Sequence, residues 1–455
     1  MKQILIYSFI FSLVWVSTLQ GQTVSRQYLK NWSDPEIEER IHTGIEKNRK
    51  GWADITFVDD KGNPVEWSGQ IQVRQTSHDF LFGANIFMLN GYEEEWENKQ
   101  YEQIFKDLLN FATVPFYWKT LEPGKGNIRF SENSRHIYRR PAPDMVVEFC
   151  KKNNITMKGH PLFWDNAQWN IPTWWPSEKD SLEFLIRRHV QKIANRYRND
   201  ILHWDVVNEV NARHVDVPVP DQFPSMVFEV AEKYFGYDNQ FTYNFTTNVW
   251  RDYKEEYGLE YLLAENLLLK GAKVDAIGFQ CHMWGHGQWK SILEGKHMTP
   301  QHMLKFLDLF AQFDLPILIT EVTFPTLPEG KTGEKNQARI TRDWYRLWFS
   351  HPHVKGITWW NVSDGTAAGS EDQWKGGFLR KDMSPKPSYQ VLDDLINHEW
   401  KTQITQEVEN QFNYKFKGFY GTYEVSLLQH GEEIMSQTIQ LDEDRENEFQ
   451  FDLAE

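Results

Sequence analysis

The chain has 455 residues, of which 40% are hydrophobic, so it can bury a large core in one big domain or in two to three smaller ones. Its formal net charge of −15 argues against nucleic acids and anionic membranes as partners, because basic surfaces bind both. The unusual numbers are 20 Trp, 18 Tyr and 30 Phe; flat rings with a polar edge suit stacking on sugars, although most of these Trp are expected in the core.

The first 22 residues are typical of a secretory signal peptide. Lys2 is followed by an apolar run over residues 4–16 and then by small and polar residues. This run is too short to indicate a membrane span, and no other stretch approaches the roughly 18 apolar residues that would. We therefore expect a secreted or periplasmic protein with no membrane span. Cys150 and Cys281 fall in apolar elements, where two buried free thiols are favoured over a disulfide.

Residues 23–79 are expected to form a β-rich segment. A helix start is indicated at Pro35, and two strands are indicated over residues 52–58 and 65–76. The turn between these strands, residues 59–64, is rich in residues that break regular structure. We expect this unit to pack against the domain that follows.

From residue 80 to 398, short apolar runs alternate with amphipathic helical segments. The apolar runs cover residues 81–86, 111–114, 156–163, 201–207, 241–244, 274–280, 317–320 and 356–360. The helical segments cover residues 93–109, 145–153, 181–198, 224–235, 249–269, 300–313, 336–349 and 388–398. This alternation predicts an α/β fold, a (β/α)8 TIM barrel. An open doubly wound sheet is weakened by the count of strands and by the lack of a G-x-G-x-x-G turn after the first strand.

Residues 399–455 change pattern again. Aromatic residues alternate at Phe412, Tyr414 and Phe416, and Gly418 and Gly421 follow without any helical period. The pattern predicts a small β-strand module that the N-terminal strands could complete. A role in packing is favoured over a separate role in binding sugar.

Two glutamates stand at the ends of two predicted strands of the barrel. Glu209 follows the fourth strand and Glu321 ends the seventh, and these strands lie across the barrel mouth from each other. One such glutamate alone is more often a solvated strand end. The adjacent Asn208 and the Trp, His and Gln residues at other strand ends favour function instead. Two carboxyl groups on either side of one bond are what glycoside hydrolysis requires.

The motifs around these residues resemble glycoside hydrolase family 10, the retaining endo-β-1,4-xylanases. The most specific is Trp204-Asp205-Val206-Val207-Asn208-Glu209. Supporting matches are Gly159-His160-Pro161-Leu162-Phe163-Trp164, Ile277-Gly278-Phe279-Gln280-Cys281-His282, Ile319-Thr320-Glu321, Ile357-Thr358-Trp359-Trp360 and Pro385-Lys386-Pro387-Ser388-Tyr389. The resemblance covers about residues 82–392.

The resemblance implies a role for each matching residue. Glu209 would be the acid/base and Glu321 the nucleophile of a double displacement on a β-1,4-linked, xylan-type polysaccharide. Asn208 would bond the sugar 2-hydroxyl, and His282 would bond the nucleophile. The residues expected to bind substrate are His160, Trp164, Asn208, Gln280, His282, Trp360, Trp118 and Tyr117.

Three departures from the family pattern affect the substrate. The stretch Thr113-Val114-Pro115-Phe116-Tyr117 lacks the Glu, Asn and Lys that hold the distal sugar in the family. Thr323 stands where an Asp usually follows the nucleophile, so His282 lacks its usual carboxylate partner. Asp165 stands where the family has His. Linkage and mechanism are therefore better supported than xylan itself, and another or a decorated β-glycan stays open.

The sequence supports other functions less well. A glycan-binding protein without turnover would fit the lost distal residues, but both glutamates and Asn208 are kept. A serine esterase lacks a G-x-S-x-G turn. His282 and His286 are four residues apart, but no third metal ligand follows at helical spacing. We expect no metal or other cofactor, a monomer, and a polysaccharide as the only partner.

Overall fold

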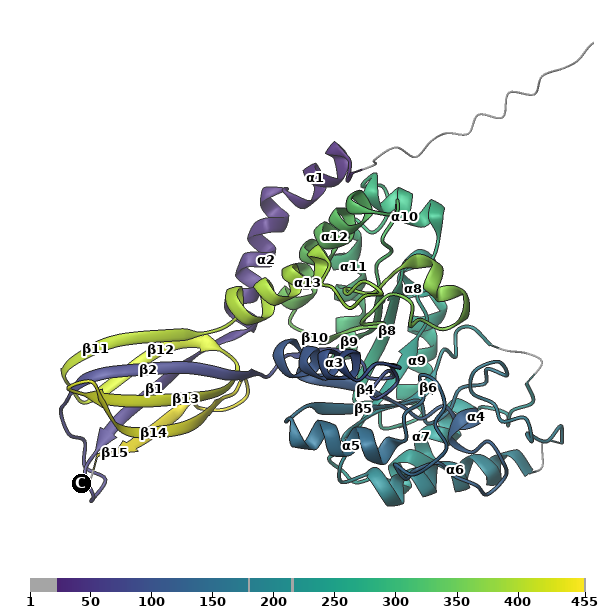
Figure 1. Ribbon diagram of the computed structural model, residues 1–455, viewed down its shortest axis with the longest axis horizontal. Coiled ribbons are helices and arrows are strands. Elements are labelled where there is room, and N and C mark those ends of the chain that lie inside the picture. The colour runs from purple at the N-terminus through teal and green to yellow at the C-terminus, as the bar shows by residue number, and fades with distance from the viewer. Residues whose placement is uncertain (1–22, 179–180, 214–216, 454–455) are drawn as a thin grey trace, which may run out of the picture.

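The computed structural model describes residues 23–178, 181–213 and 217–453. Within these residues, a closed barrel of parallel strands lies beside a second body built from two smaller sheets (Figure 1). The expected signal peptide, residues 1–22, lies outside the described residues. No helix in the described part of the chain is long and apolar enough to cross a membrane.

The barrel confirms the (β/α)8 fold. Neighbouring strands follow the order β10-β3-β4-β5-β6-β7-β8-β9, and every neighbouring pair is parallel. The strands are β3 (Leu81–Asn85), β4 (Phe111–Pro115), β5 (Thr156–His160), β6 (His203–Asn208), β7 (Gln240–Phe245), β8 (Ala276–His282), β9 (Ile317–Thr323) and β10 (Val354–Trp359). Every residue of β8 and β9 is buried, as expected for strands enclosed on both faces.

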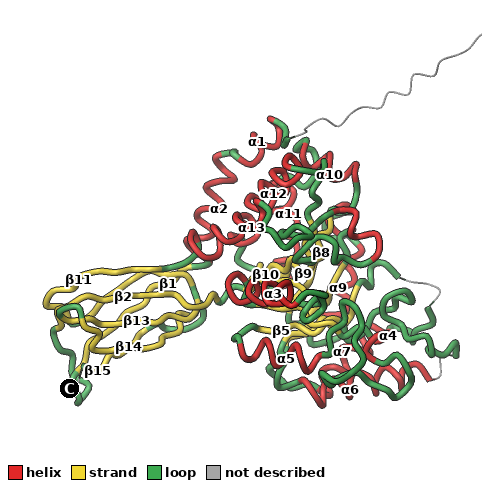
Figure 2. Tube along the Cα trace, viewed as in Figure 1, coloured by secondary structure: helices red, strands yellow, loops and turns green. Residues whose placement is uncertain are grey.

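Helices surround the barrel, and Figure 2 shows them in red around the yellow strands. Those that precede β9 are α3 (Glu95–Leu108), α4 (Trp118–Leu121), α5 (Pro143–Lys152), α6 (Leu182–Tyr197), α7 (Phe223–Tyr234), α8 (Asn248–Arg251), α9 (Leu259–Leu269), α10 (His286–Leu293) and α11 (Pro300–Phe310). Those that follow are α12 (Lys331–Ser350) and α13 (Pro387–Asp393), which a π-helical turn extends to Glu399.

The prediction of a single helix over residues 249–269 is wrong. The chain leaves the helical conformation after Arg251 and re-enters it at Leu259. Glu255 has a positive φ of 56°, and Gly258 is extended at the N-cap of α9, so neither residue can continue a helix.

The second body joins strands from both ends of the described chain. Strands β1 (Lys50–Val58), β12 (Asn413–Phe419) and β15 (Glu448–Asp452) form one sheet. Strands β2 (Trp67–His78), β11 (Gln403–Gln411), β13 (Gly421–Gln429) and β14 (Glu432–Leu441) form the other. One apolar core containing Phe57, Val73, Tyr423 and Phe451 lies between them. We call these two sheets the β module.

Residues 26–48 belong with the barrel rather than with the β module. They form α1 (Arg26–Trp32) and α2 (Pro35–Asn48), which begins at Pro35 as the sequence indicates. The Tyr28 hydroxyl donates to Asp343 on α12 at 2.9 Å, and Glu38 pairs with Arg346 at 2.8 Å. Figure 1 shows both helices beside α12. Cys150 and Cys281 are both buried and free.

Candidate active site

A cavity of about 300 Å³ opens at the carboxyl ends of the barrel strands, where catalytic residues of this fold are found. Glu209 and Glu321 both line it, although 112 positions separate them in sequence (321 − 209). Glu209 follows β6, and Glu321 lies within β9. The structure therefore brings the two predicted carboxylates to one site.

Gln280 links the two glutamates. Its Nε2 donates to Glu209 Oε1 at 2.8 Å and to Glu321 Oε1 at 3.1 Å. Because one nitrogen contacts both oxygens, those oxygens lie no more than about 6 Å apart, near the roughly 5–5.5 Å between carboxyl groups of retaining glycosidases. The register of β8 on β9 sets this contact, since Gln280 pairs with Glu321 across the two strands.

The two glutamates favour their protonated forms more than ordinary carboxyl groups do. Burial, followed by the charge of Glu321, raises the pKa of Glu209 to about 8. Burial also raises the pKa of Glu321 to about 7, against the opposing charges of His160 and Lys158. The pKa of Glu209 is thus the higher of the two. Glu209 also has a positive φ of 56°, a strained conformation of the kind that is common at functional sites.

His282 holds Glu321 from a second side. Its Nε2 lies 3.2 Å from Glu321 Oε2, and its Nδ1 lies 2.9 Å from Thr323 Oγ1. Burial lowers the pKa of His282 to about 3, so the ring is neutral. A neutral ring satisfies both contacts if Nε2–H donates to Glu321 and Nδ1 accepts from the threonine hydroxyl. Thr323 therefore fixes the tautomer of His282 without adding a charge.

A buried ion pair between Lys158 and Asp205 holds His160 in place. Asp205 Oδ2 lies 2.7 Å from His160 Nδ1 and 2.9 Å from Lys158 Nζ, and all three side chains are at most 1% exposed. Burial alone would raise the pKa of Asp205, but Lys158 and His160 together lower it below the ordinary value. The other ring nitrogen of His160 lies 3.9 Å from Glu321 Oε1. The network therefore orients His160 toward Glu321.

Replacing Lys158 by methionine is expected to lower the free energy of unfolding by about 3–5 kcal/mol, because it leaves Asp205 charged in the core without its cation. Denaturant unfolding followed by circular dichroism would measure the loss. Lys151→Met is the matched control, since it breaks an ion pair with Asp200 in which Lys151 is 59% exposed, and such pairs contribute about 0–1 kcal/mol. Equal effects of the two substitutions would contradict the importance of this network.

Aromatic side chains form the walls of the cavity. Tyr117, Trp164 and Trp360 all line it. The ring of Tyr117 packs against His160 at 5.4 Å and against Trp164 at 6.2 Å between centroids. Phe87 packs edge-on against Trp360 at 5.3 Å and holds that wall from behind. These flat surfaces suit contact with sugar rings.

Asn208 also lines the cavity, and Asn244 at the end of β7 fixes its amide. The Nδ2 of Asn244 donates to Asn208 Oδ1 at 2.7 Å and to Glu321 Oε1 at 3.3 Å. In turn, Thr320 donates to Asn244 Oδ1 at 2.6 Å. A hydrogen bond from Asn208 also lowers the pKa of Glu209. The sequence analysis did not include Asn244 among the site residues, although Asn244 is the last residue of a predicted strand.

Trp118 was expected to contact substrate, and the structure contradicts this prediction. Its side chain is fully buried and does not line the cavity. The ring stacks on His189 at 3.8 Å, and Nε1 donates to Glu122 at 2.9 Å. Trp118 begins the short helix α4, so its side chain cannot share the direction of Tyr117. Trp118 belongs to the core that supports this wall.

The structure adds residues to the cavity that the sequence reasoning did not identify. Arg139 and Arg140 line it from the loop before α5, and Glu371 lines it from a short 3-10 helix, Gly369–Trp374, that follows β10. Trp169 and Trp284 line its remaining edges, with Trp284 stacked on His282 at 3.9 Å. The consecutive arginines were visible in the sequence, but no periodic pattern assigns their loop to the barrel mouth.

Asp165 lies beside the cavity, at the position where the family has His. It is fully buried, and its Oδ2 lies 2.7 Å from Arg213 Nε. Its charge raises the pKa of Glu209 further. This departure from the family pattern therefore acts on the protonation of Glu209.

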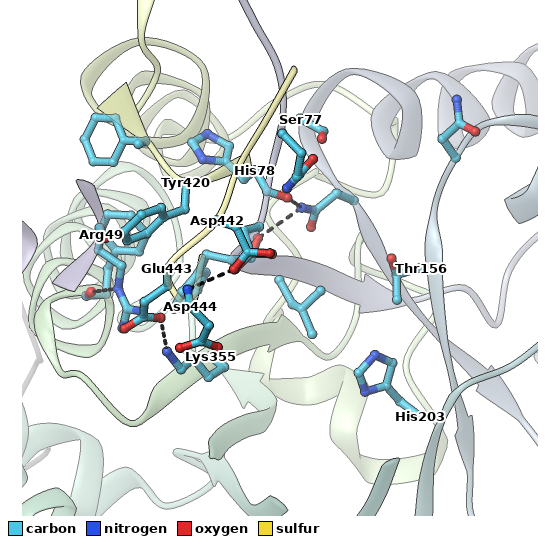
Figure 3. A pocket seen from close by; sticks show the side chains of 18 of the residues that line it. Arg49, Ser77, His78, Thr156, His203, Lys355, Tyr420, Asp442, Glu443 and Asp444 are labelled. Carbon is cyan, nitrogen blue, oxygen red and sulfur yellow. Dashed lines mark hydrogen bonds and ion pairs between the residues drawn. The ribbon is translucent and has the colours of Figure 1, made fainter. Parts of the chain in front are cut away.

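A larger cavity of about 630 Å³ lies at the opposite end of the barrel, between the amino ends of the strands and the β module (Figure 3). Thr156 and His203 of the barrel and Tyr420 and Glu443 of the β module line it, and Lys355 pairs with Glu443 at 2.5 Å across it. In this fold, the amino-terminal end serves stability rather than catalysis.

Comparisons with known proteins place the chain in one family. The model of glycosyl hydrolase family 10 matches residues 77–395. Endo-1,4-beta-xylanase B of Thermotoga neapolitana is 24% identical over 71% of this chain and 89% of its own length. Endo-1,4-beta-xylanase A of Caldicellulosiruptor saccharolyticus is 27% identical over 64% of this chain and 85% of its own length.

Two further similarities concern length and fold. An anti-sigma-I factor of Acetivibrio thermocellus is 25% identical over 90% of this chain, although the chain spans only 48% of that protein. The crystal structure of xylanase 10B from Thermotoga petrophila, in complex with xylobiose, aligns with a TM-score of 0.55 and 21% identity. That alignment covers 70% of this chain and 94% of the xylanase, and it concerns the fold alone. Because the family model covers the whole barrel and the cavity at its mouth, this chain belongs to glycosyl hydrolase family 10 and is an endo-1,4-β-xylanase-like glycoside hydrolase.

Proposed function

We propose that this enzyme cleaves a β-1,4-linked, xylan-type polysaccharide inside the chain and retains the anomeric configuration. The observation that carries the proposal is the contact of one Gln280 nitrogen with both Glu209 and Glu321, which keeps the two carboxyl groups close. A short separation leaves no room for a water between the sugar and the second carboxylate, so that carboxylate attacks the sugar itself.

In the first step, Glu321 attacks the anomeric carbon, and Glu209 gives its proton to the departing glycosidic oxygen. The bond between the sugars breaks, and a covalent bond between the sugar and Glu321 forms. In the second step, Glu209 takes a proton from water, and the resulting hydroxide displaces Glu321 from the same carbon. Two inversions give net retention. Asn208 would bond the sugar 2-hydroxyl, a contact that strengthens in the transition state.

The order of the two pKa values supports this assignment of roles. Glu209 has the higher pKa and keeps its proton when Glu321 has lost its own, as the first step requires. His282 and Gln280 both donate hydrogen bonds to Glu321, which stabilises the carboxylate form that attacks. His160, Tyr117, Trp164 and Trp360 would form the walls around the sugar that becomes attached to Glu321.

The dependence of kcat/KM on pH is expected to be bell-shaped, with both limbs above the ordinary range of carboxyl groups. Below the lower limb Glu321 is protonated and cannot attack, and above the upper limb Glu209 has no proton to give. With pKa values of about 7 and about 8, the maximum falls near neutral pH. The two limbs belong to the pair rather than to single residues. Initial rates on an aryl β-xylobioside between pH 4 and 10 would measure the profile, and a maximum near pH 4 would contradict it.

The substrate is tested by incubating purified protein with a set of plant and algal polysaccharides and separating the products by chromatography. Release of short β-1,4-linked xylo-oligosaccharides of mixed length supports the proposal. Release of one monosaccharide or disaccharide would instead indicate action at chain ends. Release of products from a different β-glycan alone would favour the second candidate, a retaining hydrolase of that polymer, which the replaced residues 113–117 keep open. Binding without any product would indicate a glycan-binding protein.

We also propose that the enzyme acts outside the cytoplasm as a monomer. The apolar run over residues 4–16, with its basic start and small, polar end, supports export. Sequencing the amino terminus of the protein recovered from the medium or periplasm would test this, and an intact Met1 would contradict it. Light scattering of the purified protein would give the oligomeric state.

A further inference from the structure

Arg139 and Arg140 are buried cations at the mouth of the barrel. Both line the cavity that contains Glu209 and Glu321, and their residues are only 5% and 9% exposed. Burial of a guanidinium is costly unless a charged or polar partner replaces water. The whole chain carries a formal net charge of −15, so a general surplus of cations does not account for two arginines here.

Their partners within the protein are few. Each guanidinium has five N–H donors. Arg139 donates through Nη1 to the carbonyl of Thr366, and Arg140 donates through Nη1 to the carbonyl of Arg139 at 2.8 Å. The Nε of Arg139 is buried without a hydrogen-bond partner. Among the described residues, neither guanidinium forms an ion pair with a carboxylate. Several donors of the two guanidinium groups therefore have no partner within the described part of the protein, and both residues line the cavity.

Aromatic rings hold the pair in place. The guanidinium of Arg140 lies over the ring of Tyr117 at 3.8 Å, and both arginines lie over Phe87 at 5.2–5.5 Å. Burial lowers the pKa of Arg140 to about 10, so its side chain stays charged at neutral pH. Glu371 lines the same cavity, and its charge acts on Arg140, but among the described residues it forms no ion pair with either arginine, and its Oε2 has no hydrogen-bond partner. One carboxylate thus faces two cations, which leaves an excess of positive charge on this wall.

The cavity wall that contains Arg139 and Arg140 lies on the same side of the active site as Glu321. Tyr117 touches Arg140 and also packs against His160, whose Nε2 lies 3.9 Å from Glu321 Oε1. The sugar that would be attached to Glu321 therefore extends toward the arginines. Tyr117 belongs to the stretch 113–117, which lacks the polar groups that hold a neutral distal sugar in the family.

We propose that Arg139 and Arg140 form a subsite for an anionic substituent, a carboxylate or a sulfate ester, on a sugar of the polysaccharide bound in the cleft. Both groups match the planar fork of N–H donors that a guanidinium presents. The inference rests on the proposed function, because it places this sugar on the Glu321 side of the bond that is cleaved. It would make the enzyme select an acidic glycan over a neutral one.

Calorimetry on the full-length Glu209→Gln variant tests the subsite without hydrolysis. The ligands are a xylo-oligosaccharide with a glucuronic acid substituent, the same compound with its carboxyl group reduced to an alcohol, and the same backbone with a sulfate ester. We expect at least one anionic ligand to bind about 10- to 100-fold more tightly than the reduced one, as for hydrogen bonds to charged groups. Whichever anionic ligand binds more tightly identifies the source of the charge. Equal affinities for all three ligands overturn the proposal.

Second substitutions in the same background assign the preference to residues. Arg140→Gln and Arg139→Gln are each expected to remove most of the preference, because each weakens binding of the anionic ligand more than binding of the reduced ligand. Arg135→Gln is the matched control, because Arg135 is exposed in the same loop and does not line the cavity. A preference that survives both cavity substitutions overturns the proposal. If Arg139→Gln does not fold, the result for Arg140→Gln still tests whether the arginines cause the preference. In addition, raising the salt concentration should weaken binding of the anionic ligand alone.

Turnover by the wild-type enzyme separates this inference from the proposed function. Hydrolysis of the reduced and the acidic oligosaccharides at equal kcat/KM would keep the hydrolase and reject the arginine subsite. A preference in binding without any hydrolysis would keep the subsite and reject the proposed reaction. If the proposed reaction and the arginine subsite are both correct, we expect the preference for the acidic oligosaccharide in KM rather than in kcat, because the arginines contact the substituent and not the bond that breaks.

Discussion

Glu321→Ala is expected to lower kcat/KM on an aryl β-xylobioside by about 10⁴-fold or more, because the covalent path disappears with the nucleophile. The substitution removes a side chain that His282 and Gln280 hold at 3.2 Å and 3.1 Å, so it leaves a space facing the anomeric carbon. Added azide should enter that space and attack the sugar directly. A single displacement inverts the configuration, so the product is expected to be an α-glycosyl azide. Proton NMR of the product measures both the rescue and the configuration.

Glu329→Ala is the control for this substitution. Glu329 lies in the loop after β9, is 65% exposed at its side chain and pairs with Lys375 at 3.0 Å, away from the cavity. Its loss is expected to leave kcat/KM unchanged. Substantial activity in Glu321→Ala without azide, or a rescued product in the β-configuration, would show that Glu321 is not the nucleophile.

Glu209→Ala is expected to lower kcat on polysaccharide by about 10²- to 10⁴-fold, the usual contribution of general acid–base catalysis. The loss should be smaller in the first step for aryl glycosides whose phenol departs without a proton. The second step still lacks its base, so the enzyme linked to the sugar should accumulate and show a burst of phenol. Azide then attacks this intermediate and gives a β-glycosyl azide, the opposite configuration to that expected from Glu321→Ala. Stopped-flow absorbance and NMR measure the two effects.

Glu209→Gln separates proton transfer from positioning. Glutamine has the size of glutamate, and its oxygen can accept the bond that Gln280 donates at 2.8 Å, but it neither gives nor takes the proton. It should lose as much activity on polysaccharide as Glu209→Ala, and its pH profile should lack the alkaline limb. An activity close to wild type would mean that Glu209 only positions other groups.

The barrel could be predicted from the sequence because its strands are buried on both faces. Strands such as β8 and β9 consist entirely of buried residues, and they read as apolar runs that end in polar side chains. The family motifs then assigned Glu209 and Glu321 to strand ends that meet across the mouth. The break between α8 and α9 was hidden, because the apolar pattern continues while Glu255 and Gly258 leave the helical conformation.

Trp118 and the arginines show what local sequence could not supply. Tyr117 and Trp118 are neighbours at the start of a helix, so only one of them can face the cavity, and the motif does not say which. Arg139 and Arg140 belong to an irregular loop whose course over the barrel depends on long-range packing. Arg139, for example, is held by the carbonyl of Thr366, which lies 227 positions away. Contacts between residues so far apart in the sequence leave no periodic pattern from which they could be predicted.

The β module also determines how the protein can be shortened. Ser68 in β2 bonds Asn410 in β11 across 342 positions, so β1 and β2 leave the ribosome long before their partner strands exist. Until then their open edges can pair with other chains. A truncation after residue 398 would make that state permanent, and we expect it to aggregate. An internal deletion of residues 50–78 as well would remove these exposed edges and keep α1 and α2 on the barrel, so removing both parts of the β module should be safer than removing one.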